Sequence, residues 1–113
     1  MPLNPATLAI LLSLAAEERH GYAIMQEVTR QSNGRQKLGP GTLYDNLAKL
    51  LDQGLVEQVE NKPIPGDDPR RRYYRLSATG SQVLSAEVDR LEEIVRAARA
   101  ALAVVAPAGD GRA

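Results

Sequence analysis

Residues 37–56 read KLGPGTLYDNLAKLLDQGLV, and this stretch decides the fold because it predicts one short helix with defined ends. Gly39 is an acceptable N-cap, and Pro40 suits the first helical position, where its missing N–H loses no hydrogen bond. Gly54 suits the left-handed residue just past the end of the helix. Between these ends, leucines at helical spacing predict one apolar face turned toward a core: Leu43, Leu47, Leu50 and Leu51.

The opposite face of this helix is expected to be polar and exposed. It consists of Thr42, Tyr44, Asp45, Ala48, Lys49 and Asp52. Hydroxyl, carboxylate and ammonium groups near the start of a helix can hydrogen-bond phosphates and base edges, and the small Ala48 permits close approach. A core helix with an ordinary solvated face has a similar composition. This helix alone therefore leaves a DNA recognition helix and a plain core helix equally open.

The totals of the chain restrict the classes of protein that fit it. A length of 113 residues suits a single domain. Lys and Arg number 14 and so do Asp and Glu, so any attraction to nucleic acid must come from local clusters of charge. The absence of cysteine excludes disulfides, a thiolate zinc site and a cysteine nucleophile. With no basic leader and no apolar run of about 20 residues, we expect a soluble, cytoplasmic protein without membrane contact.

Two helices are expected before residue 37. Asn4 and Pro5 form a cap and first turn for the first helix. Its apolar stripe is predicted to be Leu8, Leu11, Leu12 and Ala15, with Ile10 and Leu14 beside it. After a polar corner at residues 17–19, the tripeptide His20-Gly21-Tyr22 opens a second helix that ends near Gln31, before the stop signal Ser-Asn-Gly at 32–34. Ile24, Met25 and Val28 are predicted to face inward. Short helices joined by compact turns in this way indicate a helix-turn-helix.

After Gly54 the apolar period changes from helical to alternating. Residues 55–60 are predicted to form a strand with Leu55, Glu57 and Val59 on one side. Residues 71–76 form its partner, with Tyr74 and Leu76 inward. Between the strands, KPIPGDDP at 62–69 predicts a long hairpin tip, because its prolines remove ladder donors. The hairpin corresponds to the wing of a winged helix.

Positive charge collects on the two elements that a winged helix lays on DNA. Residues 62–75 hold five cations and two acids, a net charge of +3, and the cations include Arg70, Arg71, Arg72 and Arg75. Residues 35–49 carry +2, from Arg35, Lys37 and Lys49 against Asp45. Beside a recognition helix, we interpret the arginine run as a phosphate-binding surface rather than a solvated strand end.

The last predicted helix begins after Ser77, a good N-cap, and ends before Pro107. Gly80 lowers helix propensity, so close packing against a neighbour is its expected reason. A heptad seam follows at Leu84, Val88, Leu91, Val95, Ala98, Leu102 and Val105. The other face is mixed in sign, as a solvated face should be: Glu87, Asp89, Arg90, Glu92, Glu93, Arg96 and Arg99.

This organisation divides the chain into three parts. Residues 1–76 are a winged helix-turn-helix domain, residues 77–106 a dimerisation helix, and residues 107–113 a disordered tail. The fold class is mainly α with a small β-hairpin. The long helix would project beyond the domain, at about 1.5 Å of rise per residue, and its apolar stripe needs a partner that a two-fold homodimer supplies.

The motifs in order resemble the PadR-type winged-helix transcriptional regulators. They are His20-Gly21-Tyr22, Leu38-Gly-Pro-Gly-Thr-Leu-Tyr44, Gly54-Leu55-Val56, and the run from Arg70 to Ser77 followed by Gly80. The single C-terminal helix is similar to that of the short subgroup, whose members are dimeric repressors. The resemblance implies that Thr42 and Tyr44 lie at the DNA-contacting start of the recognition helix. It also implies that Tyr22 lies near the backbone and that residues 70–72 lie on the wing.

Some short members bind flat aromatic drugs in the dimer groove by stacking them on tryptophan. This chain has no tryptophan, so that mode of binding is not carried over, and the identity of any small-molecule effector stays open.

The function predicted from these observations is a homodimeric transcriptional regulator, a repressor, that binds an inverted-repeat operator in double-stranded DNA. The predicted DNA-contacting residues are Tyr22, Lys37, Gly41, Thr42, Tyr44, Asp45, Lys49, Arg70, Arg71 and Arg72. The alternative is a winged-helix module that binds another protein, which the zero net charge and the acids Asp45 and Asp52 favour.

An enzyme is disfavoured because no convergent catalytic set is visible. His20 is the only histidine, so a structural role at the helix entry is favoured over a metal site or a catalytic triad. Gly39 and Gly41 lack the GK[ST] of a phosphate-binding loop. No cofactor and no metal are expected.

Overall fold

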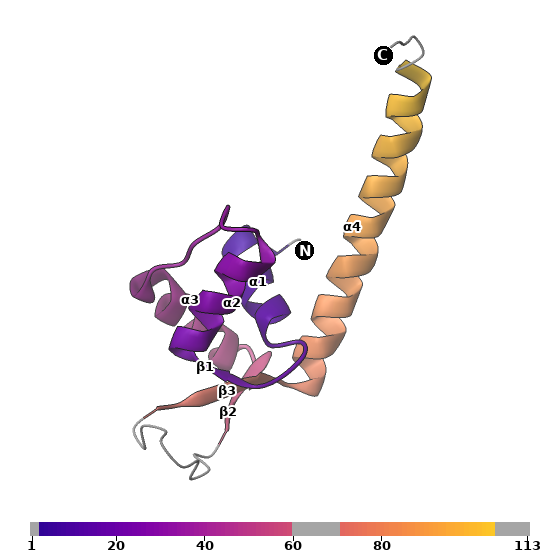
Figure 1. Ribbon diagram of the computed structural model, residues 1–113. Coiled ribbons are helices and arrows are strands. Elements are labelled where there is room, and N and C mark those ends of the chain that lie inside the picture. The colour runs from indigo at the N-terminus through magenta and orange to yellow at the C-terminus, as the bar shows by residue number, and fades with distance from the viewer. Residues whose placement is uncertain (1–2, 60–70, 106–113) are drawn as a thin grey trace.

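The computed structural model describes residues 3–59 and 71–105 (Figure 1). Its elements are α1 (Pro5–Ser13), β1 (Arg19–His20), α2 (Gly21–Gln31), α3 (Pro40–Asp52), β2 (Val56–Val59), β3 (Tyr73–Leu76) and α4 (Ala78–Val105). The predicted fold class is confirmed: three short helices and a small antiparallel sheet precede one long helix. The predicted hairpin tip at 62–69 and tail at 107–113 lie outside the described residues. None of the helices within residues 3–59 and 71–105 combines the length and the hydropathy that a membrane span requires.

Local signals set the helix ends as expected. The side chain of Asn4 accepts a hydrogen bond from the backbone N–H of Thr7 at 2.9 Å and caps α1. α3 begins at Pro40 after Gly39, and Gly54 beyond its end has a φ of 74°. Asn33 and Gly34, with φ values of 54° and 81°, stop α2. A left-handed backbone conformation stops a helix, and glycine adopts it without strain.

The core lies among the first three helices. Its fully buried side chains include Ile10, Leu11, Ile24, Val28, Leu43, Leu47 and Leu50. The predicted stripe of α1 is wrong at two positions, since Leu12 is 38% exposed and the helix ends at Ser13, before Ala15. This helix is apolar nearly all round, so periodicity alone could not select the buried face.

The sheet contains a strand that the sequence did not predict. Its order is β1-β3-β2, with Arg19 opposite Tyr74 and His20 opposite Tyr73. The expected polar corner is therefore an edge strand that joins the helices to the wing. Arg19 stabilises it, because its Nε donates to the carbonyl oxygen of Ser13 at 2.6 Å.

The predicted strands at 55–60 and 71–76 are present and begin later than expected, at Val56 and Tyr73, and residue 60 lies outside the described part of the chain. Val56 lies opposite Leu76 on the inner side of the β2–β3 pair, and Val56 is 2% exposed. Glu57 lies opposite Arg75, and the Arg75 Nε to Glu57 Oε1 distance is 3.0 Å. Arg75 is thus paired with Glu57, both side chains being about half exposed, and its charge is partly compensated.

The start of α4 is fastened to the domain. Ser77 Oγ accepts from the Gly80 N–H at 2.9 Å and donates to the Gly54 carbonyl at 2.6 Å. A side chain at Gly80 would overlap the carbonyl oxygen of Leu55, which confirms close packing as the reason for this glycine. Leu84, one turn further, is buried in the core.

Glu87 contradicts the expectation of a solvated face. It is 5% exposed, and Arg90 donates to its two carboxylate oxygens at 2.9 and 2.7 Å. The N–H of Leu3 donates to the same carboxylate at 3.3 Å. The N-terminal segment therefore covers this part of α4. Beyond Leu91 the helix leaves the domain, and residues 92–104 are all exposed (Figure 1).

Candidate nucleic-acid interface

One face of α3 is buried and the other is exposed, as predicted. Leu43, Leu47 and Leu50 are at most 2% exposed. The predicted solvent face, Thr42, Tyr44, Asp45, Ala48, Lys49 and Asp52, is exposed at every position. Asn46 fixes the rotation of α3, because its Nδ2 donates to the Thr42 carbonyl at 2.8 Å and its Oδ1 accepts from Thr7 Oγ1 of α1 at 3.0 Å.

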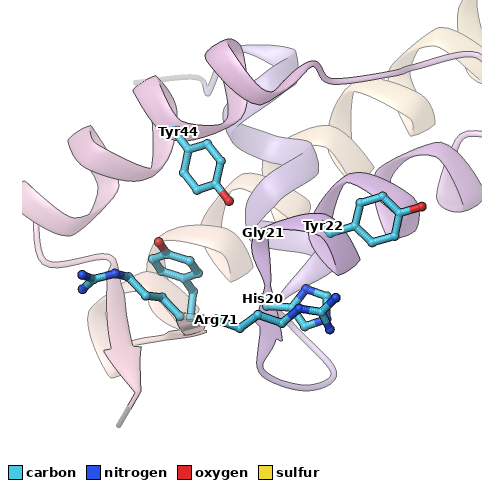
Figure 2. Close-up of a pocket in the computed structure, with 7 residues that line it drawn as sticks. His20, Gly21, Tyr22, Tyr44 and Arg71 are labelled. Atoms are coloured by element: carbon cyan, nitrogen blue, oxygen red, sulfur yellow. The ribbon is translucent and has the colours of Figure 1, made fainter. Parts of the chain in front are cut away.

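Beside this exposed face, α2, α3 and the sheet enclose an open cleft of about 370 Å³ (Figure 2). The residues that line it are His20, Gly21, Tyr22, Tyr44, Arg71, Arg72 and Tyr74. Four of the predicted DNA contacts, far apart in the sequence, thus meet in one place: Tyr22, Tyr44, Arg71 and Arg72. The cleft joins the helix-turn-helix to the base of the wing.

Tyr44 and Gly21 form the contact between α3 and α2 in this cleft. Figure 2 shows the Tyr44 ring directed toward Gly21, and a side chain at Gly21 would overlap the Tyr44 hydroxyl. Tyr44 is nevertheless 49% exposed, so part of its ring remains accessible. The absence of a side chain at Gly21 therefore leaves room for the Tyr44 ring between the N-terminal parts of the two helices.

His20 connects α2 to β3. Its Nδ1 accepts a hydrogen bond from the Ala23 N–H at 3.2 Å and caps α2. Its ring meets the Tyr73 ring edge to face, with centroids 5.3 Å apart. Its Nε2 lies 3.1 Å from Nη1 of Arg71, which extends across to the histidine (Figure 2). The expected structural role at the helix entry is confirmed, and the ring also faces the wing.

An ion-pair cluster behind the cleft holds β1 against α2. Glu27 is 9% exposed, and its carboxylate accepts hydrogen bonds from Arg30 and lies 3.8 Å from Arg19 Nη2. The hydrogen bond from Arg30 lowers the pKa of Glu27, against the opposing effect of burial, so this carboxylate stays ionised. Arg19 precedes His20, so the cluster also positions the histidine.

The remaining predicted contacts do not line the cleft. Gly41, Thr42, Asp45 and Lys49 lie exposed on α3, and Lys37 is exposed in the segment before it. Arg70 lies outside the described residues. No group of three or more His, Asp or Glu side chains in the described part of the chain is placed to hold a metal ion.

Besides Tyr74, which was predicted to face inward, His20 and Gly21 are the cleft residues that the sequence did not assign to DNA binding. The tripeptide His20-Gly21-Tyr22 was a signal for them, since it combines a cap, a position without a side chain and an exposed hydroxyl. Their role depends on β1, whose two residues are too few to show an alternating pattern.

Comparison with known proteins agrees with this geometry. The family model described as the transcriptional regulator PadR-like family matches residues 10–86. A 37.1 kDa protein of a Streptomyces fradiae transposon is 37% identical over 87 residues, which are 77% of this chain. The chain spans only 23% of the length of that relative.

Two solved structures show the same architecture. A PadR-like transcriptional regulator from Bacillus cereus superposes with a TM-score of 0.71 at 19% identity, over 85% of this chain and 89% of that one. Bacillus subtilis PadR in complex with operator DNA superposes with a TM-score of 0.64 at 25% identity, over 77% of this chain and 48% of that one.

Proposed function

Because the chain belongs to the PadR-like family of transcriptional regulators, we propose that it is a repressor that binds an inverted-repeat operator as a homodimer. The observation that carries this proposal is the cleft in which Tyr22 and Tyr44 of the helix-turn-helix meet Arg71 and Arg72 of the wing. One continuous surface thus combines groups suited to base edges with groups suited to phosphates.

The geometry of α3 supports base readout in the major groove. Thr42, Asp45 and Lys49 are exposed and lie three and four residues apart, so they share one face of the helix. A recognition helix of a helix-turn-helix places the residues near its N-terminus against base edges. The Bacillus subtilis relative is in complex with operator DNA, and we extend that class of ligand to this chain.

The wing supports backbone contacts on the same side. Arg71 and Arg72 are exposed and line the cleft next to the start of α3. Guanidinium groups bind phosphates in two-pronged geometry, and such contacts set register without reading sequence. The wing arginines would therefore hold α3 in the groove whatever the base sequence.

The exposed apolar stripe of α4 supports a homodimer. Val88, Val95 and Leu102 are 44%, 49% and 64% exposed, and Leu91 and Ala98 continue the same face. Leu84 at the head of the predicted seam belongs to the core of its own chain, and the side chain of Val105 is outside the described set. A second copy offers an identical stripe, and two-fold symmetry covers both at once.

Selection of bound fragments from genomic DNA, followed by gel shift, tests the proposal. We expect the selected fragments to share an inverted repeat with half-sites one helical turn apart, about 34 to 36 Å. A promoter fused to that site should be silenced when the protein is produced. Absence of any selected sequence would favour the alternative of a protein-interaction module, and activation of the promoter would reject repression.

Variants of α3 test base readout separately. Lys49→Ala or Asp45→Ala should change which bases are preferred at one position per half-site, by about 1 to 3 kcal/mol between bases. Arg72→Ala is the matched control, since loss of a phosphate contact weakens binding to every operator variant alike. A uniform loss from the α3 variants would argue against base readout at these positions.

A further inference from the structure

The outer half of α4, residues 92–104, carries charged side chains that have no partner in their own chain. Glu92 and Arg99 are both exposed, and neither forms an ion pair with any residue in the ranges 3–59 and 71–105. In the inner half, by contrast, the carboxylate of Glu87 is paired with Arg90. The unpaired charges of the outer half are therefore available to a second copy of the chain.

These charges lie beside the exposed apolar seam in a regular way. Helical spacing places Glu92 and Arg99 along one flank of the seam, and Ile94 and Ala101 along the other. Ile94 is 50% exposed and is not a member of the seam. One flank thus carries opposite charges seven residues apart, and the other flank carries apolar side chains only.

The two possible orientations of a second α4 would pair these flanks differently. In a parallel pair each flank faces the opposite flank of the partner, which would set Arg99 beside the apolar Ile94. In an antiparallel pair each flank faces its own equivalent, so Glu92 meets the partner's Arg99 and Ile94 meets the partner's Ala101. Antiparallel pairing therefore joins opposite charges on one side and apolar groups on the other.

The position of the domain also favours the antiparallel orientation. Leu84, at the inner end of the seam, is 7% exposed because the domain of its own chain covers this face (Figure 1). A parallel partner would bring the two copies of Leu84 together, and both domains would then compete for the same space. In an antiparallel pair the two domains lie at opposite ends of the paired helices.

We propose that the outer halves of α4 pair antiparallel across the two-fold axis, with Glu92 of each copy bound to the partner's Arg99. This inference rests on the proposed function, because it specifies how the homodimer is built. Two such pairs form in each dimer by symmetry. Exposed ion pairs contribute little affinity, so the seam supplies most of the stability and the charges select the orientation and register.

The register that these ion pairs define agrees with the exposure of the seam. It aligns Leu91 with the partner's Leu102. The helix ends at Val105, and in this register that end lies opposite the partner's Val88. Val88 is 44% exposed and is the first seam residue that the domain leaves uncovered. The segment that pairs is thus the same segment that each domain leaves exposed.

Reversal of one charge at a time tests the ion pairs. In the Glu92→Arg homodimer two arginines face each other at both positions, and in the Arg99→Glu homodimer two glutamates do. We expect each substitution to raise the dimer dissociation constant about tenfold at low salt. An equimolar mixture of the two variants should form heterodimers as stable as the native dimer, because every arginine then faces a glutamate. Sedimentation equilibrium measures all three samples.

Glu93→Arg and Arg96→Glu are the matched controls. They make the same charge changes on the outer side of the paired helices, and both positions are exposed. Each control should dimerise like the native protein, and a mixture of the two should show no comparable preference for heterodimers.

Cross-linking tests the orientation without altering any charge. The native chain has no cysteine, so an introduced thiol is unique. A short bismaleimide should join Leu91→Cys to Leu102→Cys chains only when the two are mixed, because the register aligns these positions. In Leu91→Cys alone, antiparallel pairing separates the two thiols by about 16 Å along the helix axis, at about 1.5 Å per residue, which is beyond the reach of the reagent.

Three outcomes would overturn the inference. If both charge reversals dimerise like the native protein and their mixture shows no preference, the ion pairs do not form, and the proposed homodimer stands. If Leu91→Cys cross-links alone and not with Leu102→Cys, the helices pair in parallel. If the native protein is monomeric at every concentration, the proposed homodimer itself fails.

Discussion

The two halves of α4 share one apolar pattern but differ completely in packing. In the inner half, up to Leu91, Gly80 touches the Leu55 backbone, Leu84 is buried in the core and Glu87 lies beneath the N-terminal segment. In the outer half, residues 92–104 are all exposed, and Val95 and Leu102 are about half exposed or more.

This difference shows that a heptad pattern indicates a helix face that must be covered. It does not indicate whether the same chain or a second copy covers that face. At 1.5 Å per residue the 28 residues of α4 extend about 42 Å, further than the small domain can cover. The apolar face of the inner half packs against its own chain, and we infer that a second copy covers the apolar face of the outer half. Substitutions in each half separate these two sources of stability.

Loss of the outer seam should have the largest effect. Val95→Asp combined with Leu102→Asp places charge in the proposed interface and should produce monomers, with operator affinity reduced by about a hundredfold or more because the second half-site is lost. Sedimentation velocity and gel shift measure both effects. Ala97→Asp with Val104→Asp is the matched control, since it adds the same charge at the same spacing on the opposite face. A seam variant that remains dimeric would show that the interface lies elsewhere.

Truncation of one leucine in each half to alanine should affect folding of the chain in one case and dimerisation in the other. Leu84→Ala should lower the free energy of unfolding by about 3 kcal/mol through a cavity in the core of its own chain, with little change in the dimer dissociation constant. Leu102→Ala should mainly weaken the dimer. Urea denaturation at fixed protein concentration and sedimentation equilibrium measure the two quantities. If both variants lowered the free energy of unfolding equally at low protein concentration, the two halves of α4 would not differ in what stabilises them.

Adding one methyl group tests how rigid the inner attachment is. Gly80→Ala should destabilise the protein by about 2 kcal/mol, because the new group meets the backbone carbonyl of Leu55. Gly21→Ala is the control, since its methyl meets only the outer end of the Tyr44 side chain, which can move aside. We expect the melting temperature to fall for the first variant and to change little for the second. If both fall alike, Tyr44 is fixed as firmly as the Leu55 backbone.

The smallest expected effect is on the stability of the protein at acidic pH. The hydrogen bonds from Arg90 lower the pKa of Glu87 in the folded protein, against the opposing effect of burial. The stabilising contribution of Glu87 is therefore full above its unfolded pKa, about 4.3, and disappears as pH falls through the lower folded value. Glu87→Gln should be less stable near neutral pH and should lose less stability on acidification.

Thermal denaturation between neutral and acidic pH measures this difference. Glu93→Gln, at an exposed position of the outer half, is the control and should follow the native profile. Glu27 has a lowered pKa for a similar reason, so some acid sensitivity should remain in every variant. A Glu87→Gln profile parallel to the native one would mean that the ion pair with Arg90 does not contribute to folding.

Much of the fold could be predicted because its signals are local. The caps at Asn4 and Ser77 and the left-handed Gly54 each depend on a few neighbouring residues, and the structure confirms them. The predicted stripe on α1 included the half-exposed Leu12, because an apolar helix offers more than one face to a core. Glu87 was expected in solvent because its Arg90 and Leu3 partners depend on how the N-terminus crosses α4.

The candidate site was likewise predictable only in part. Tyr22, Tyr44, Arg71 and Arg72 were predicted as separate contacts, and their proximity in one cleft was not. β1 creates that proximity, yet two residues carry no readable period. The proximity of His20 to Arg71 likewise depends on the pairing of β1 with β3.

By itself, the sequence determined where α2 and α3 begin and end, which face of α3 is apolar, and that α4 carries more apolar surface than one small domain can cover. These properties follow from backbone preferences and side-chain periodicity within a few turns of chain. The tertiary structure alone decided that β1 pairs with β3, that Glu87 is buried, and that His20 and Arg71 converge. Such contacts join residues distant in sequence, and their energies depend on a geometry that exists only once the chain has folded.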